Sequence, residues 1–224
     1  MAYFVADAAL VYAKKKDYNI IKIGGRKNMG HEVEIKLRAA DTRQLEQAFA
    51  ALKACAFAAK EKEIAMHTRY FDTPEGILRE KKWTLRIRRE NETDVLTFKT
   101  KEENHCRGEW NLQRSEDCSS PTKEELRALV EAGAPELLLE LTALQVTCEA
   151  EFTRRAAMLT LEEGSKIELA ADIGRLRGRE TQEDFCELEL ELYSGSYEKM
   201  AELAKKSGLA EEPMSKAARA MRLR

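Results

Sequence analysis

The chain has 224 residues, of which 43% are hydrophobic and 35% are charged, yet its formal net charge is only -2. This length suits one domain and is ample for a substantial core. The near balance of charge excludes the strongly basic surface typical of nucleic-acid-binding domains, so we expect no nucleic-acid partner. Opposite charges must instead lie near one another in the folded protein.

Cysteine and histidine usage indicates a reduced protein without a zinc site. The five cysteines form no Cys-x-x-Cys pair, and the three histidines lie far apart in the sequence. We therefore expect a cytoplasmic protein, and zinc is not expected because its ligands cluster. No run approaches the ~18 apolar residues that cross a membrane, so no membrane partner is expected. The sequence leaves open whether the protein is a monomer or a homodimer.

Residues 1–30 differ from the rest of the chain. They end in a glycine-rich stretch with Gly24, Gly25 and Gly30, which is typical of a flexible boundary. One interpretation is a dispensable extension or a start codon placed too early. The other is a docking segment whose apolar residues pack on the fold. We divide the chain into an N-terminal extension, 1–30, and a domain, 31–224.

The domain combines strands with a few helices. Three segments, near 45–52, 126–130 and 200–204, carry the apolar stripe of an amphipathic helix. An Asp-Thr-Pro-Glu-Gly turn occupies 72–76. Eight segments have strand character, several with strict period-two alternation. They lie at 31–40, 61–73, 83–91, 93–101, 105–115, 146–162, 166–173 and 184–193.

The alternation places charged residues together on one face of most of these strands. This charged face contains Glu32, Glu34, Lys36, Arg86, Arg88, Glu90, Lys99, Lys101, Arg107, Glu109, Glu168, Asp172, Glu187, Glu189 and Glu191. For a single strand, the simple interpretation is an antiparallel sheet with one wet face. Eight strands favour curling or closure, and three amphipathic helices need an apolar surface to cover. The sequence thus predicts an α+β fold: a closed eight-stranded antiparallel β-barrel, or tunnel, with the helices packed outside and the charges inside.

An enclosed charged interior persists only if its charges pair, hold metals or await a charged ligand. Residues i and i+2 of a strand lie about 6.5–7 Å apart on one side, so Glu32 with Glu34, and Glu187 with Glu189, form two carboxylate pairs. Such pairs suit a hard cation such as Mg²⁺. Cationic side chains that bind phosphate oxygens form the complement. These are Arg86, Arg88, Lys99, Arg107 and Arg154. Together they predict a short polyphosphate ligand bound with divalent metal ions.

At these residues the sequence resembles the CYTH superfamily, the triphosphate tunnel metalloenzymes, and within it the bacterial inorganic triphosphatase branch. The resemblance covers roughly 31–222 and depends on the order of several motifs. They are Glu-Val-Glu-Ile-Lys at 32–36, Tyr-Phe-Asp-Thr-Pro at 70–74, Leu-Arg-Ile-Arg at 85–88, Thr-Phe-Lys at 97–99, Phe-Thr-Arg at 152–154, Ile-Glu-Leu-Ala at 167–170, Cys-Glu-Leu-Glu-Leu-Glu-Leu at 186–192 and Ser-Lys-Ala-Ala-Arg at 215–219.

The resemblance implies metal-dependent hydrolysis of a triphosphate, most simply inorganic tripolyphosphate, with Mg²⁺ or Mn²⁺ as cofactor. The residues expected to hold the phosphates are Lys36, Arg86, Arg88, Lys99, Arg107, Arg154 and Lys216, the last by its similarity to a tunnel-end lysine. The expected metal ligands are Glu32, Glu34, Glu109, Asp172, Glu187 and Glu189. Glu32, Glu34 and Lys36 form the expected catalytic group.

Two alternatives remain open from the sequence. One keeps an enzyme but changes its substrate, giving an adenylate cyclase or a thiamine triphosphatase. The other is a non-catalytic polyphosphate-binding module. The carboxylate pairs favour an enzyme over the module, because the capture of an anion alone does not need them.

Overall fold

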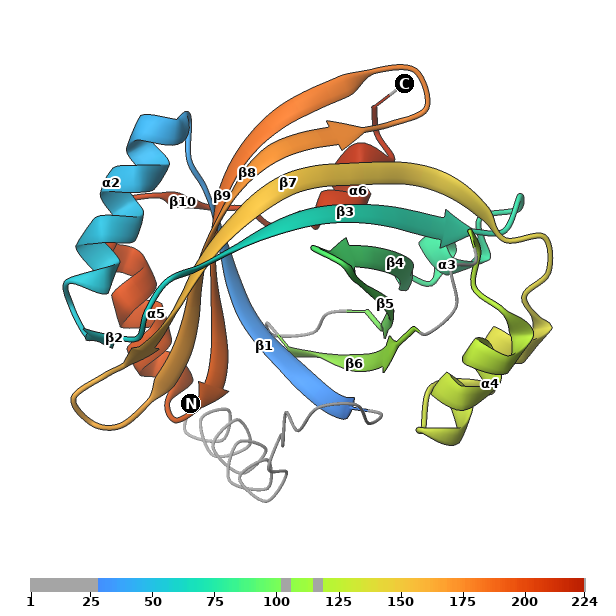
Figure 1. The fold of residues 1–224 in the computed structure, drawn as a ribbon, viewed down its shortest axis with the longest axis horizontal. Coiled ribbons are helices and arrows are strands. Elements are labelled where there is room, and N and C mark those ends of the chain that lie inside the picture. The colour runs from blue at the N-terminus through green and yellow to red at the C-terminus, as the bar shows by residue number, and fades with distance from the viewer. Residues whose placement is uncertain (1–27, 102–105, 115–118, 224) are drawn as a thin grey trace, which may run out of the picture.

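The computed structural model describes residues 28–101, 106–114 and 119–223, and for 28–32 and 106–107 it describes the backbone alone. Its strands form one antiparallel sheet that curves into an arch (Figure 1). They are β1 (Asn28–Arg38), β2 (Phe57–Ala58), β3 (Lys62–Asp72), β4 (Thr84–Glu90), β5 (Thr93–Lys99), β6 (Cys106–Gln113), β7 (Gln145–Thr160), β8 (Lys166–Arg177), β9 (Gln182–Ser194) and β10 (Ala210–Glu211). The spatial order is β10-β1-β6-β5-β4-β3-β7-β8-β9, with β2 beside β7.

Strand β1 changes partners along its length. Residues 28–33 pair with β6, whereas residues 34–38 pair with β9. β1 therefore contacts both ends of the run of strands that leads from β6 through β3 to β9. This dual pairing brings the strand with Glu34 and Lys36 beside the strand with Glu187, Glu189 and Glu191.

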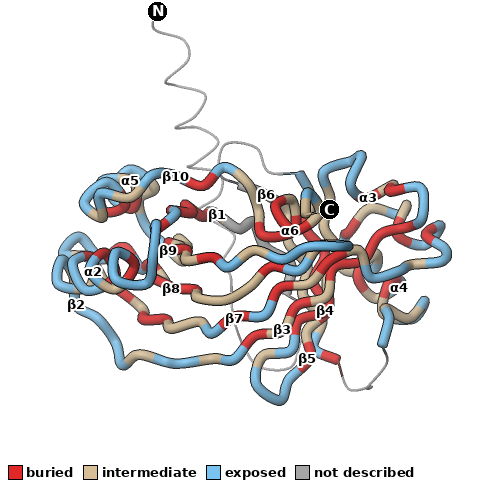
Figure 2. Tube along the Cα trace, turned by 90° about the horizontal axis from the view of Figure 1, so that it is seen from above, coloured by how far each residue is buried: buried red, intermediate tan, exposed pale blue. Residues whose placement is uncertain are grey.

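Two sets of helices cover the apolar outer face of the sheet. Helices α2 (Thr42–Lys53) and α5 (Tyr197–Lys206) pack Leu45, Phe49 and Met200 against the outward residues of β1, β7, β8 and β9. Helix α4 (Lys123–Glu131) and the 3-10 helix η1 (Glu136–Glu140) cover β4 and β5 in the same way. Figure 2 shows the outer sides of α2 and α5 exposed and many positions of the strands buried. The three predicted helices and their outside packing are thus confirmed.

A further helix lies on the concave side of the sheet. Helix α6 (Lys216–Ala220) packs Ala217 and Ala220 against a buried cluster that includes Phe152, Leu176 and Phe185 (Figure 1). Phe152 shares the inward face of β7 with Arg154, two residues further along the strand. α6 therefore occupies the interior of the arch, which the sequence did not predict.

The turn after β3 is built on one carboxylate. Asp72 accepts hydrogen bonds from the backbone N–H groups of Thr73, Leu78 and Arg79, at 2.8, 2.9 and 3.0 Å. Gly76 has a φ of 79°, which favours glycine at this position. The predicted turn at 72–76 is confirmed, and it leads into the short helix α3 (Ile77–Glu80).

The prediction of an antiparallel, β-rich α+β fold is confirmed, but in the described parts of the chain the sheet has ten strands and not eight. The additional strands, β2 and β10, have two residues each, which is too short for a period-two pattern to reveal them. The closed barrel stays a prediction. The expected extension lies almost wholly outside the described residues, and β1 begins inside its boundary, at Asn28.

Candidate functional site

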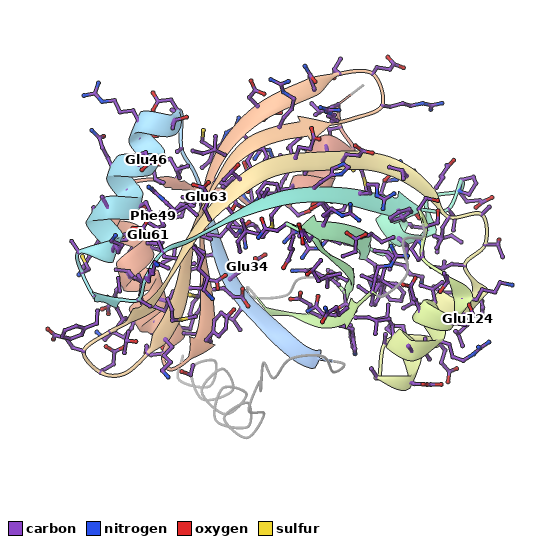
Figure 3. All side chains as sticks on the ribbon, viewed as in Figure 1. Glu34, Glu46, Phe49, Glu61, Glu63 and Glu124 are labelled. Atoms are coloured by element: carbon purple, nitrogen blue, oxygen red, sulfur yellow. The ribbon has the colours of Figure 1, made fainter. Side chains whose placement is uncertain are left out.

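The inward faces of β1 and β9 form a wall that is rich in carboxylates. Glu34 pairs with Glu191 across the two strands, and Lys36 pairs with Glu189. The Nζ atom of Lys36 lies 2.9 Å from an oxygen of Glu34, and both side chains are buried. Figure 3 shows Glu34 inside the arch, whereas Glu46 and Phe49 of α2 lie outside it. The alternation on β1 therefore points Glu34 into the interior.

The opposite wall is cationic and comes from β4 and β5. Arg88 is buried, and its Nε donates to the hydroxyl of Thr68 at 3.0 Å. Burial, and then the neighbouring charge of Arg86, lowers the pKa of Arg88 to about 10. Arg88 is thus still a cation at neutral pH. Nζ of Lys99 lies 3.4 Å from Glu109.

Arg86 has a polar atom without a partner. Its Nε is buried and makes no hydrogen bond within the described parts of the chain. A buried N–H group without an acceptor costs free energy, about 1–3 kcal/mol or more for a charged group. An anionic ligand in the interior would supply the missing acceptor. This atom is the clearest sign in the structure of a binding site for an anion.

Lys216 and Arg154 enter the interior from α6 and β7. Arg154 binds Asp172 with two hydrogen bonds of 2.7 Å and also contacts Glu189. Nζ of Lys216 lies 2.7 Å from Glu189 and 2.9 Å from Asp172. Burial by itself would lower the pKa of Lys216, but Asp172, Glu187 and Glu189 outweigh it and raise that pKa.

Glu189 connects the carboxylate wall to α6 and β7, because it contacts both Lys216 and Arg154. Burial would raise the pKa of Glu189, but the charges of Lys216 and Arg154 hold it well below the ordinary value for a glutamate. Burial raises the pKa of Glu187 in spite of the same lysine. The two carboxylates of the predicted Glu187–Glu189 pair thus lie in different environments.

One pocket collects most of these side chains. Its walls carry both signs of charge and several hydroxyl groups, so its chemistry fits a polyanion together with cations. It is lined by Glu34, Lys36, Tyr70, Thr84, Arg86, Arg88, Lys99, Arg154, Glu189, Glu191, Ser215, Lys216 and Ala217.

The structure brings eight predicted site residues to this pocket. They are Glu34, Lys36, Arg86, Arg88, Lys99, Arg154, Glu189 and Lys216. Asp172 and Glu187 lie behind its wall with no exposed surface, because the cations of β7 and α6 cover them. Glu109 does not line the pocket, and it accepts a hydrogen bond of 2.9 Å from Asn111. Glu32 and Arg107 are backbone partners, but their side chains lie outside the description.

Sequence reasoning missed two acidic residues in this region. Glu191 lines the pocket and pairs with Glu34 on one side and with Glu168 on the other. The hydroxyl of Tyr193 lies 3.4 Å from Glu168. The period-two pattern had placed Glu168 and Glu191 on the charged face, but it could not tell which glutamates of β9 face Glu34. That choice depends on the register between β1 and β9.

The donor set fits a hard divalent cation, although its members are also held by lysines and arginines. Glu34, Glu189 and Glu191 bring carboxylate oxygens to one pocket, and such oxygens are the ligands that Mg²⁺ and Mn²⁺ take. Within the described residues, no group of three or more histidine, cysteine, aspartate or glutamate side chains is arranged as a metal site.

Fold and pocket define a β-rich α+β protein whose interior is built from opposite charges. The family model of the CYTH domain matches residues 30–221, so the chain belongs to the CYTH domain family. This confirms the resemblance inferred from the motifs. No helix among the described residues has both the length and the apolar character needed to span a membrane.

Relatives support this assignment. Over 131 residues the chain is 34% identical to the inorganic triphosphatase of Haemophilus influenzae, a match that covers 57% of this chain and 36% of that protein. The chain thus spans about a third of the length of that relative.

Solved structures share the fold. A putative adenylate cyclase from Bacillus halodurans is similar with a TM-score of 0.54 and 17% identity, over 84% of this chain and 95% of that one. A protein from Pyrococcus horikoshii gives a TM-score of 0.52 with 20% identity, over 84% and 96% of the two chains. A putative adenylyl cyclase from Hippeastrum, described as having a dominant triphosphatase activity, gives 0.50 with 21% identity, over 84% and 93%.

Proposed function

We propose that the protein is a metal-dependent triphosphatase that hydrolyses inorganic tripolyphosphate in the pocket beneath the arch. The observation that carries the proposal is the buried Nε of Arg86, which lacks an acceptor beside Arg88 and opposite a carboxylate wall. The CYTH family and the inorganic triphosphatase relative support the choice of substrate. The pairing of β1 with both β6 and β9 supports a closed tunnel around the ligand.

The cationic residues would bind and align the phosphate chain. Arg86 and Arg88 offer guanidinium groups that can bind two phosphate oxygens at once, whereas Lys99 and Lys216 act as point charges. Arg154 is already held by Asp172, so its guanidinium is fixed before the ligand arrives. Fixed donors stabilise the charge that develops on the transferred phosphoryl group without reorganisation during the reaction.

The carboxylate wall would hold the divalent cation, with Glu34, Glu189 and Glu191 as the ligands that the pocket offers, and with Glu32 as a further candidate. When bound, Mg²⁺ or Mn²⁺ would neutralise phosphate charge and make the attacking water more acidic. Lys36 holds Glu34 in place through its ion pair. The chain's own contribution is therefore to orient the phosphates, to fix the carboxylates and to surround the reacting groups with charge.

A substrate panel tests the proposal. The protein is incubated with tripolyphosphate, ATP or thiamine triphosphate and Mg²⁺ or Mn²⁺, and phosphate, pyrophosphate and cyclic AMP are measured. We expect phosphate release from tripolyphosphate that stops in EDTA and returns when Mg²⁺ or Mn²⁺ is added. Cyclic AMP as the main product would favour the cyclase, and preferred turnover of thiamine triphosphate would favour that substrate. Binding of tripolyphosphate without turnover would favour the non-catalytic module.

A further inference from the structure

Arg219 lies in the ionic network behind the pocket, one helical turn from Lys216 on α6. It is buried, and it is absent from the pocket lining described above. Its guanidinium contacts Glu187 and lies 2.5 Å from Glu183 and 3.7 Å from Glu212. Arg219 therefore spans three carboxylates without touching the space where a ligand would bind.

Glu187 connects Arg219 to the pocket. This side chain has no exposed surface, and its two oxygens have different partners. Oε1 accepts from Arg219, whereas Oε2 lies 2.5 Å from Nζ of Lys216. One buried carboxylate thus bridges two cations that are three residues apart on the same helix. Loss of the positive charge of Arg219 therefore changes the electrostatic attraction between Glu187 and Lys216.

The charge balance around Lys216 depends on Arg219. Lys216 contacts three carboxylates, those of Asp172, Glu187 and Glu189. Arg154 neutralises part of this charge from β7, and Arg219 supplies the third cation. Without Arg219, these three carboxylates would be balanced by two cations only, Lys216 and Arg154, which leaves one excess negative charge next to the pocket. Glu187 would then attract Lys216 more strongly, and the excess charge would repel an incoming polyanion.

We infer that Arg219 is a positioning residue, which keeps the ammonium of Lys216 available to a polyanion in the pocket by neutralising Glu187 from behind. The inference rests on the proposed function, since it assigns Lys216 to the triphosphate. It also changes the role of Glu187, which the sequence analysis had assigned to a metal. Glu187 acts here as the link between two cations.

The chain offers a matched control. Arg38 lies near two of the carboxylates that Arg219 contacts, Glu183 at 3.4 Å and Glu212 at 3.7 Å, but the side chain of Arg38 is 54% exposed. Arg38 is the direct cross-strand partner of Glu187, but within the described residues its guanidinium makes its ion pairs with Glu183 and Glu212 and not with Glu187. Arg38→Gln therefore removes a cation from the same neighbourhood and leaves the link to Lys216 intact.

The experiment measures KM and kcat for tripolyphosphate, and calorimetric binding of pyrophosphate, in five proteins: wild type, Arg38→Gln, Glu187→Gln, Arg219→Gln and the double variant Glu187→Gln/Arg219→Gln. Thermal melting checks that each is folded. We expect Arg219→Gln to raise KM and the pyrophosphate Kd by about tenfold, with kcat changed less than about threefold, since a buried charge is left uncompensated. Arg38→Gln should stay within about twofold of wild type.

The double variant separates positioning from a structural role. Removing the charge of Glu187 together with that of Arg219 restores the balance, so we expect KM to return to within about threefold of wild type. A double variant that is as impaired as Arg219→Gln, or an unchanged KM in Arg219→Gln, would overturn the inference.

If Arg219→Gln alone does not fold, Glu187→Gln provides the reference. A double variant within about twofold of the KM of Glu187→Gln then supports positioning, and a further tenfold rise overturns it. A wild-type protein that neither binds nor cleaves tripolyphosphate would refute the proposed function instead. A protein that cleaves it with no effect of Arg219→Gln would refute only the inference.

Discussion

Glu34 on β1 and Glu191 on β9 are direct antiparallel partners, and both side chains line the same pocket. Like charges directly opposite each other on neighbouring strands destabilise a sheet unless a cation compensates them. Lys36 provides one such cation at 2.9 Å from Glu34. The position of this pair, opposite Arg86 and Arg88, makes it the best place on the carboxylate wall for a divalent cation that also contacts phosphate.

Substitution of single carboxylates by amides tests whether Glu34 and Glu191 hold the divalent cation. Glu34→Gln and Glu191→Gln each remove a charge with almost no change in volume. We expect each to lower kcat for tripolyphosphate by at least about 100-fold and to raise the Mg²⁺ or Mn²⁺ concentration needed for half-maximal rate. Glu187→Gln should keep its metal requirement near that of wild type, because Glu187 has no exposed surface and is held by Lys216 and Arg219. If Glu187→Gln alone raised the metal concentration needed for half-maximal rate, the metal would instead be assigned to the Glu187–Glu189 pair.

Arg88 tests the phosphate side of the pocket. Arg88→Ala removes a charged contact worth about 1.5–3 kcal/mol, so we expect the KM for tripolyphosphate to rise by about tenfold to more than a hundredfold. Added metal should not rescue it. Arg89 is the control, because it points to the other face and binds Asp94 at 2.8 Å. Arg89→Ala should leave calorimetric binding of pyrophosphate unchanged, and equal loss in both variants would mean that the effect of Arg88 is not local.

The burial of Arg88 also leads to a prediction for the stability of the ligand-free protein. Burial and Arg86 lower the pKa of Arg88 to about 10, so the folded protein holds this proton less tightly than the unfolded chain does. At pH 7 the side chain is charged in both states, and its charge costs folding free energy. We expect ligand-free Arg88→Met to melt at or above the wild-type temperature. Pyrophosphate with Mg²⁺ should raise the melting temperature of wild type more than that of the variant. A clear loss of stability in the ligand-free variant would contradict this reasoning.

Acid should weaken the fold through Glu189. The folded-state pKa of Glu189 lies well below the ordinary value for a glutamate, because Lys216 and Arg154 outweigh the effect of burial. Its contribution to stability is therefore present above the unfolded pKa and is lost as the pH falls through the folded pKa. Urea unfolding between pH 7 and pH 3 should show a smaller fall in unfolding free energy for Glu189→Gln than for wild type. If the unfolding free energy of the two proteins fell equally with pH, Glu189 would not contribute to the loss of stability in acid.

Two cysteines should react at very different rates. Cys148 is buried, and burial raises the pKa of its thiol to about 12, whereas Cys55 is exposed on the surface. The thiolate is the reactive form, so we expect alkylation of Cys55 by iodoacetamide at pH 8 to be at least about 100-fold faster. Mass spectrometry of digested protein measures each site separately. Comparable rates would show that the segment of β7 around Cys148 opens readily in solution.

The sequence by itself determined the features that depend on neighbours along the chain. The period-two alternation on β1, β4 and β9 was enough to separate Glu34, Arg88 and Glu189 from the apolar residues that α2, α4 and α5 cover. The apolar stripe of α2, with Leu45, Phe49 and their neighbours, likewise predicted a helix on the outside. These patterns are local, because a strand repeats every two residues and a helix about every 3.6.

Tertiary structure alone decided which charges meet. The register between β1 and β9 places Glu191, and not Glu187, opposite Glu34, and no pattern within either strand specifies that register. The five-residue helix α6 is too short for a period to reveal it, yet it carries Lys216 into the pocket and Arg219 behind it. Both arrangements join residues that are far apart in sequence. Packing and charge compensation across the whole fold determine which of these residues meet. The sequence pattern of a single strand or helix contains no information about them.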